Sequence, residues 1–142
     1  MSIVRRNGEE EVLRKKMFGG DGEAEMHVIL KAPEEMYGKG RVFNRVVLAP
    51  GAEVAWHVHH GDGECYYILK GEGTYSDNGN IITMRPGDMS FVGDGEGHSM
   101  RNDGSEDLEM IALILYICER RRSQRAEELR PYDFSRRFFH ES

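Results

Sequence analysis

Short segments of strand character follow one another through the middle of this chain, each about five to ten residues long and rich in β-branched or aromatic side chains. Glycine-rich turns separate them, and the chain has 17 glycines but only four prolines. One turn, SDNGN, carries the Asn78–Gly79 pair, the strongest short-range signal for a β-hairpin. Turn signals at this spacing are typical of an all-β sandwich or barrel. We therefore expect strands within residues 25–31, 41–50, 53–59, 64–71, 73–79, 80–87, 88–93, 98–104 and 108–117.

The two ends of the chain lack this pattern. Residues 5–17 are compatible with a short helix or with an irregular lead-in to the first strand. Near the other end, a helix is expected from about Ser123, its N-cap, to Pro131, which would end it. The basic arm at residues 119–142 is interpreted as packing on its own domain or on a partner subunit, with a basic recognition arm as the alternative.

Length and charge limit the possible architectures and partners. Residues 1–142 are expected to form one domain, a barrel at about 23–118 followed by the arm. The formal net charge of −6 argues against a nucleic-acid partner, because recognition of nucleic acid depends on neutralising phosphates. No apolar run approaches the roughly 18–20 residues that span a bilayer, and no signal-peptide pattern is recognised. We therefore expect a cytoplasmic protein with no membrane partner.

The stretch HVHHGDGE gathers three histidines and a glutamate within residues 57–64. Alternate side chains of a strand share a face, so His57 and His59 point one way and His60 points the other. A hairpin would bring Glu64 opposite the two histidines, and the later strand that begins at His98 can neighbour them in an antiparallel barrel. Three imidazoles and a carboxylate form a transition-metal ligand set that leaves one or two positions open. The expected ligands are His57, His59, Glu64 and His98, and His60 is interpreted as a bystander.

This spacing resembles the two motifs of the cupin superfamily. The first motif is matched at every defining position by Gly51-x5-His57-x-His59-x4-Glu64-x6-Gly71, and the second is approached by Gly87-x5-Gly93-x-Gly95-x2-His98-x3-Asn102. Gly93 stands where the family usually has proline, a change that concerns loop stiffness and not ligation. The 15 residues between the motifs are similar to the short spacing of small single-domain microbial cupins. The resemblance covers about residues 41–116 and implies an antiparallel double-stranded β-helix, the jelly-roll or cupin barrel, here with a short C-terminal helical extension.

Side chains around the expected metal, among them Tyr66, Ile68, Met84 and Met100, predict a mostly apolar pocket. Alternation within residues 41–50 places Val42, Asn44, Val46 and Leu48 inside the barrel and Arg41, Phe43, Arg45 and Val47 outside it. Tyr66 shares a face with Glu64 and can donate a hydrogen bond to a metal-bound ligand. Asp94 and Glu96 shortly precede His98 and are the nearest carboxylates for acid-base chemistry. Tyr66, Asp94 and Glu96 are therefore the candidate catalytic residues.

The function class follows from the expected metal. No Ser-His-Asp order, phosphate loop or dinucleotide fingerprint is present. By resemblance, metal-bearing cupins include dioxygenases, decarboxylases of small carboxylic acids, and sugar isomerases and lyases, alongside binding modules without turnover. We expect one divalent transition metal ion per chain (Mn, Fe, Ni or Zn) and an enzyme acting on a small polar or carboxylated metabolite. A non-catalytic metal- or ligand-binding or sensing module is the alternative.

Self-association is expected as well. Small cupins resemble one another in forming dimers. Trp56, Val58 and Tyr67 are expected to point outward from the ligand-bearing strands and to supply one apolar patch that a homodimer would cover.

Overall fold

The computed structural model describes residues 2–31 and 33–118, which form ten strands and one short 3-10 helix. The strands are β1 (Val12–Lys15), β2 (Ala24–Leu30), β3 (Gly40–Leu48), β4 (Glu53–Val58), β5 (Asp62–Lys70), β6 (Gly73–Asp77), β7 (Asn80–Met84), β8 (Met89–Val92), β9 (Gly97–Arg101) and β10 (Leu108–Tyr116), and the helix is η1 (Glu34–Met36). All pairings between these strands are antiparallel. The all-β prediction is confirmed, and each of the nine expected segments contains a strand.

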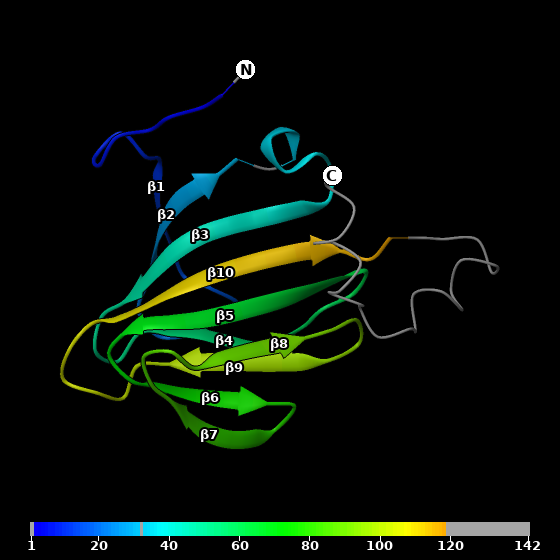
Figure 1. The fold of residues 1–142 in the computed structure, drawn as a ribbon. Helices are drawn as coiled ribbons and strands as arrows, with labels where there is room; N and C mark the ends of the chain where they lie inside the picture. The colour runs from blue at the N-terminus through cyan, green and yellow to red at the C-terminus, as the bar shows by residue number, and fades with distance from the viewer. Residues whose placement is uncertain (1, 32, 119–142) are drawn as a thin grey trace, which may run out of the picture.

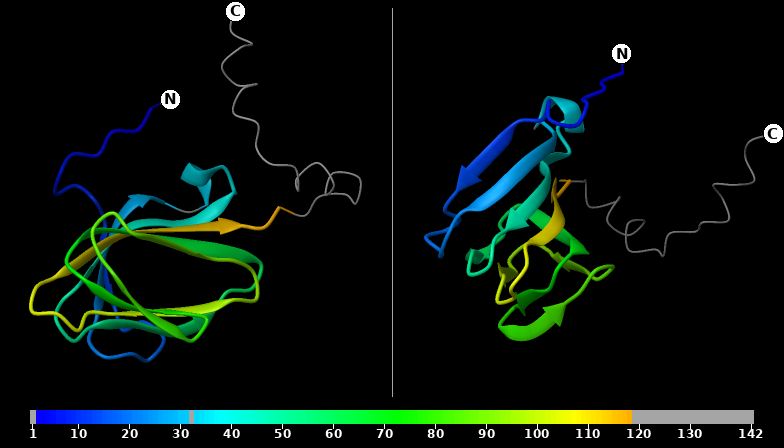
Figure 2. Two further views of the ribbon diagram at one scale, coloured as in Figure 1. Left: turned by 60° about the horizontal axis from the view of Figure 1, so that its bottom comes forward. Right: turned by 90° about the vertical axis from the view of Figure 1, so that its left-hand side faces the viewer.

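The strands form two sheets that wrap around a common interior (Figures 1 and 2). The larger sheet has the order β1-β2-β3-β10-β5-β8, and the smaller sheet has the order β4-β9-β6-β7. Figure 1 shows β1, β2 and β3 at one end of the molecule and β6 and β7 at the other. This arrangement is the predicted double-stranded β-helix, or jelly roll.

Side-chain alternation fills the interior from both sheets. Along β10 the even-numbered residues Leu108, Met110, Ala112 and Ile114 are buried. On the neighbouring strand β3, Asn44, Val46 and Leu48 are buried, and Val42 packs against the core. The predicted inward face of β3 is therefore confirmed for these four residues, because period-2 alternation places one face of each strand against the core.

The predicted hairpin at Asn78–Gly79 is confirmed. Asp77 pairs with Asn80, which leaves two residues in the turn between β6 and β7. Both have positive φ, 51° at Asn78 and 99° at Gly79. Asparagine and glycine tolerate this left-handed conformation, which a two-residue turn needs in order to match the twist of its strands.

Three expectations require correction or lie outside the description. The helix considered for residues 5–17 is wrong: Val12–Lys15 form β1, because the edge of β2 supplies backbone hydrogen-bond partners that local sequence cannot reveal. The apolar patch is not continuous, since Trp56 and Val58 project from the smaller sheet and Tyr67 from the larger one. The helix expected from Ser123 lies outside the described residues. Within those residues, no helix is long and apolar enough to cross a membrane.

Candidate metal centre

Four side chains converge in the interior between the two sheets. His57 lies on β4, His59 directly follows β4, Glu64 lies on β5 and His98 on β9. One ligand atom from each lies within 4.8 Å of those of the others. His57 and His98 are paired directly across β4 and β9, which is the neighbouring arrangement predicted for these strands.

Glu64 reaches the histidines across the interior and not across a hairpin. β4 and β5 belong to different sheets, so the turn at residues 59–61 carries the chain from one sheet to the other. The hairpin expectation is therefore wrong. The facing of the side chains is nevertheless as predicted, because strands in opposed sheets direct their inward side chains at one another.

The spacing of the four ligand atoms is compatible with their coordinating one metal ion. Glu64 Oε1 lies 3.5 Å from His57 Nε2, 3.3 Å from His59 Nε2 and 3.0 Å from His98 Nε2. The His98 nitrogen lies 3.0 Å from His57 Nε2 and 3.2 Å from His59 Nε2. Ligand bonds of about 2.0–2.2 Å place adjacent ligands about 2.8–3.6 Å apart in octahedral or tetrahedral coordination. The group could therefore hold one metal ion.

Each histidine is oriented by a different partner at its other ring nitrogen. His57 Nδ1 lies 2.8 Å from the carbonyl oxygen of Ala55, and His59 Nδ1 lies 2.6 Å from Asp62 Oδ1. His98 Nδ1 lies 2.9 Å from the hydroxyl oxygen of Tyr75. With Nδ1–H donating to these acceptors, each Nε2 carries a lone pair that points at the common centre. In this tautomer three lone pairs and a carboxylate oxygen meet at one point, an arrangement that a cation would stabilise and that protons on Nε2 would otherwise fill.

The electrostatics of the group agree with this assignment. Burial acts to raise the pKa of Glu64, but hydrogen bonds with the three histidines outweigh burial and hold that pKa far below its ordinary value. The hydrogen bond with Glu64 raises the pKa of His59, with Asp62 adding to the effect. Burial lowers the pKa of His98. The carboxylate is therefore ionised at neutral pH.

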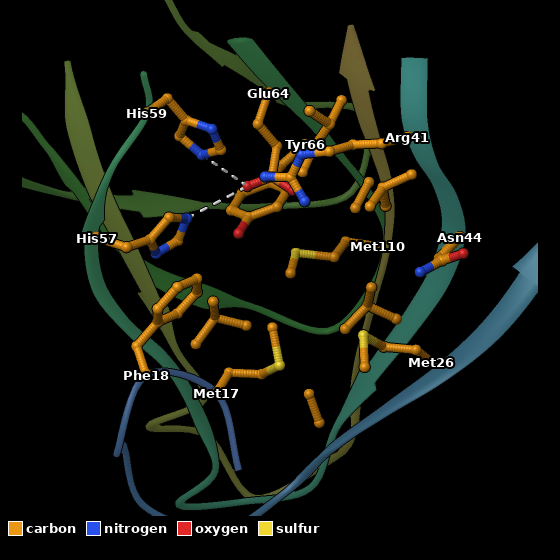
Figure 3. Close-up of a pocket in the computed structure, with 16 residues that line it drawn as sticks. Met17, Phe18, Met26, Arg41, Asn44, His57, His59, Glu64, Tyr66 and Met110 are labelled. Atoms are coloured by element: carbon orange, nitrogen blue, oxygen red, sulfur yellow. Dashed lines mark hydrogen bonds and ion pairs between the residues drawn. The ribbon is translucent and has the colours of Figure 1, made fainter. Parts of the chain in front are cut away.

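A small, mostly apolar cavity of about 90 Å³ opens beside His57, His59 and Glu64 (Figure 3). Its walls come mainly from β2, β3 and β10 of the larger sheet. The side chains that line it are Met17, Phe18, Ala24, Met26, Arg41, Val42, Asn44, Val46, Val54, His57, His59, Glu64, Tyr66, Met110, Ala112 and Ile114. An apolar pocket that includes Asn44 and Tyr66 is thus present, but the prediction is wrong for Ile68, Met84 and Met100, which are buried in the hydrophobic core and do not line this cavity.

The three candidate catalytic residues occupy different places. Tyr66 is buried in the cavity wall, and its ring stacks on that of His98 with centroids 4.7 Å apart. Burial and the nearby charge of Glu64 raise the pKa of Tyr66 well above its ordinary value. Asp94 and Glu96 are exposed in the loop between β8 and β9, where they accept hydrogen bonds from the backbone amides of Gly61 and Gly93. Neither carboxylate lines the cavity.

His60 is exposed, as the alternation predicted, and lies outside the ligand group. Sequence reasoning missed several other residues around the metal centre. Asp62 and Tyr75 orient two of the ligands, and no local pattern distinguishes them from ordinary strand residues. Phe18 stacks on His57 with ring centroids 4.1 Å apart, from a segment expected to be only a lead-in. Arg41 lines the cavity although alternation placed it outside the barrel.

Comparisons with known proteins agree with the fold. Residues 44–114 match the family model described as Cupin domain. An oxalate-binding protein from Thermotoga maritima is 46% identical over 102 residues, which cover 71% of this chain and 83% of that protein. A crystal structure from the same organism, described as a predicted oxalate decarboxylase, has a TM-score of 0.76 at 43% identity and covers 81% of this chain and 100% of its own. The structure of KdgF from Halomonas sp. has a TM-score of 0.64 at 17% identity, covers 87% of this chain and 99% of its own, and shows a likeness of fold alone.

Proposed function

The chain belongs to the cupin family, and on that premise we propose that it holds one divalent transition metal ion at His57, His59, Glu64 and His98 and binds a small carboxylate there. The convergence of three Nε2 atoms on Glu64 Oε1 carries this proposal. A bound divalent ion would act as a Lewis acid that attracts carboxylate oxygens to its open positions. Manganese, iron, nickel and zinc all suit such a ligand set.

The cavity supports a compact ligand. Its volume of about 90 Å³ is smaller than the roughly 150 Å³ of an apolar cavity that accepts benzene. A ligand of a few non-hydrogen atoms fits this space, with the metal and the few polar side chains fixing its orientation. Oxalate is the first ligand to test, because a protein 46% identical to this chain is an oxalate-binding protein.

Tyr66 is the residue of this chain best placed to assist binding. It lines the cavity beside Glu64, and its raised pKa keeps the hydroxyl protonated at neutral pH. The hydroxyl can therefore donate a hydrogen bond to a carboxylate oxygen. Asp94 and Glu96 do not line this cavity, so their contribution would be to hold the loop before His98 in place.

Turnover of the ligand is the second candidate function, and the position of Tyr66 favours it because a proton donor lies in the cavity wall. For oxalate the corresponding reaction is decarboxylation, in which hydrogen oxalate gives formate and carbon dioxide. The carbon–carbon bond breaks, its electron pair stays on the carbon of formate, and that carbon takes the proton. The structural neighbour described as a predicted oxalate decarboxylase makes this the first reaction to assay.

Calorimetry on metal-loaded and chelator-stripped protein tests the proposal. We expect oxalate to bind with about one site per chain when metal is present and not to bind after chelation. Equal binding by both forms, or none by either, would contradict it. Assays of formate release and oxygen uptake on the same samples distinguish the two candidate functions. A binding protein leaves oxalate unchanged, whereas a decarboxylase releases formate.

We further propose that the chain forms a homodimer through the outer face of the larger sheet. Tyr67, Leu69, Met89 and Phe91 on the neighbouring strands β5 and β8 are each more than 40% exposed. A contiguous apolar surface of this kind is usually covered by a partner. Sedimentation showing a monomer at micromolar concentration would refute this proposal.

A further inference from the structure

Arg41 lies at an irregularity of β3 that turns its side chain toward the cavity. In the pairing of β3 with β10, Val42 faces Ile114 and Gly40 faces Leu115, so Arg41 has no opposing residue. An extra residue of this kind is a β-bulge, which can redirect a side chain and is common beside functional sites. Regular alternation would leave Arg41 outside with Arg45, but the bulge lets it line the cavity. Figure 3 shows its side chain running from β3 toward the Glu64 side of the cavity.

One edge of the Arg41 guanidinium is held by a buried carboxylate. Nε donates to Asp62 Oδ2 at 2.8 Å, while the other oxygen of Asp62 lies 2.6 Å from His59 Nδ1. The Asp62 side chain is 8% exposed and the Arg41 side chain 45% exposed, so the pair runs from the interior to the mouth of the cavity. Within residues 2–31 and 33–118, the Nη1 and Nη2 groups of Arg41 make no hydrogen bond or ion pair. An oriented guanidinium with two unused nitrogens is preorganised to receive an anion.

Arg41 determines the net charge of the site. Among the described residues that line the cavity, Arg41 is the only arginine or lysine. With neutral histidines, Asp62 and Glu64 together cancel the two positive charges of a divalent ion. Arg41 alone then makes the site net positive, which a dianionic ligand needs more than a monoanionic one.

We propose that Arg41 determines specificity for short dicarboxylates over monocarboxylates. This inference rests on the proposed function. A dicarboxylate that reaches the metal with one oxygen from each carboxylate keeps two further oxygens on its opposite edge. Those oxygens can accept hydrogen bonds from Nη1 and Nη2, whose planar fork suits paired oxygen acceptors. Formate and acetate have only two oxygens and cannot satisfy both sets of donors.

Calorimetric titration of metal-loaded Arg41→Gln with oxalate and with formate tests the assignment. The matched control is Arg45→Gln, which removes an arginine from the same strand that is paired with Glu109 away from the cavity. We expect Arg41→Gln to weaken oxalate binding about 10- to 100-fold, as for the loss of charge-assisted hydrogen bonds, and formate binding less than about threefold. Arg41→Lys keeps the charge but not the fork and is expected to be intermediate. Arg45→Gln should bind both ligands as the unsubstituted protein does.

Metal content and circular dichroism are measured for each variant. They distinguish a role of Arg41 in recognising the carboxylate from a role in positioning His59 through Asp62. Oxalate affinity of Arg41→Gln equal to that of Arg45→Gln overturns the inference and leaves the proposed function standing. Equal weakening of oxalate and formate, or a loss of metal as large as in Asp62→Asn, also overturns it and makes Arg41 a positioning residue. If the unsubstituted, metal-loaded protein binds no carboxylate, the proposed function fails and the inference fails with it.

Discussion

Replacing Tyr75 with phenylalanine removes one oxygen atom from the interior and should weaken metal binding without removing a ligand. Tyr75 is 1% exposed and its hydroxyl oxygen lies 2.9 Å from Nδ1 of fully buried His98. Burial raises the pKa of Tyr75 to about 12, so the hydroxyl is neutral under ordinary conditions. By accepting the Nδ1–H hydrogen bond, it keeps the lone pair of His98 at Nε2, where a metal would bind.

The expected loss of metal affinity can be estimated from how the His98 imidazole responds when the Tyr75 hydroxyl is removed. A buried N–H group left without a partner costs about 1–3 kcal/mol. His98 avoids that cost by moving its proton to Nε2, which lies 3.0 Å from the acceptor Glu64 Oε1. This tautomer cannot bind a metal, so binding must first reverse it. We expect an affinity loss of about 10- to 100-fold, or about 1.4–2.7 kcal/mol.

Calorimetry with chelator competition measures the affinity of Tyr75→Phe, and long-range proton–nitrogen NMR spectra of the histidines report the tautomer of His98. Tyr67→Phe is the matched control, since it removes a hydroxyl from a half-exposed tyrosine on the outer face of β5. The unfolding midpoint of metal-free Tyr75→Phe should change little, because the moved proton finds Glu64. Unchanged metal affinity, or a His98 proton that stays on Nδ1 in the variant, would refute the tautomer argument.

Three further predictions concern the ligands, acid pH and the motif glycines. His59→Ala and Glu64→Ala should each lower metal affinity by more than about tenfold, whereas His60→Ala should leave the metal content unchanged in elemental analysis. Apparent metal affinity should weaken as pH falls, and it should do so at a higher pH than with an ordinary histidine ligand, because the raised pKa of His59 lets a proton compete with the metal earlier; a chelator-indicator titration checks this. Gly51→Ala should cost about 1–2 kcal/mol in urea unfolding because its φ is +85° with open space around it. Gly71→Ala should cost more, since its φ is +81° and a Cβ there would meet the Asp107 carbonyl oxygen at 2.5 Å.

Side-chain alternation was sufficient to predict the parts of the site that lie on regular strands. His57 and His59 face the interior and His60 faces out, because alternation holds from His57 to His60, after a register shift between Val54 and His57. The same rule placed Asn44 in the cavity wall. His98 could be expected near the others once the fold was assigned, and its direct pairing with His57 agrees with that expectation.

The remaining features depend on contacts that alternation does not encode. Whether β5 pairs with β4 or faces it across the interior is decided by which sheet each strand joins, so the route by which Glu64 reaches the histidines was predicted wrongly. Arg41 was assigned to the wrong side because a single unpaired residue reverses the alternation locally. Phe18 has a φ of 55°, unusual for a residue other than glycine, and it reaches His57 through a loop conformation that no periodic pattern specifies.

Of the three histidines in the metal site, only His59 is connected to the cavity mouth through the partner of its Nδ1 atom. The Ala55 carbonyl belongs to the backbone of β4, and the Tyr75 side chain is buried. His57 and His98 are therefore oriented by groups that a carboxylate bound in the cavity does not touch. His59 is oriented by Asp62, which also binds Arg41 at the mouth. An anion that binds the Arg41 guanidinium weakens the hydrogen bond between Arg41 and Asp62. The Asp62 carboxylate then interacts more strongly with His59. The coupling between carboxylate binding and metal affinity should therefore run through His59, and Tyr75 and Ala55 should contribute little to that coupling.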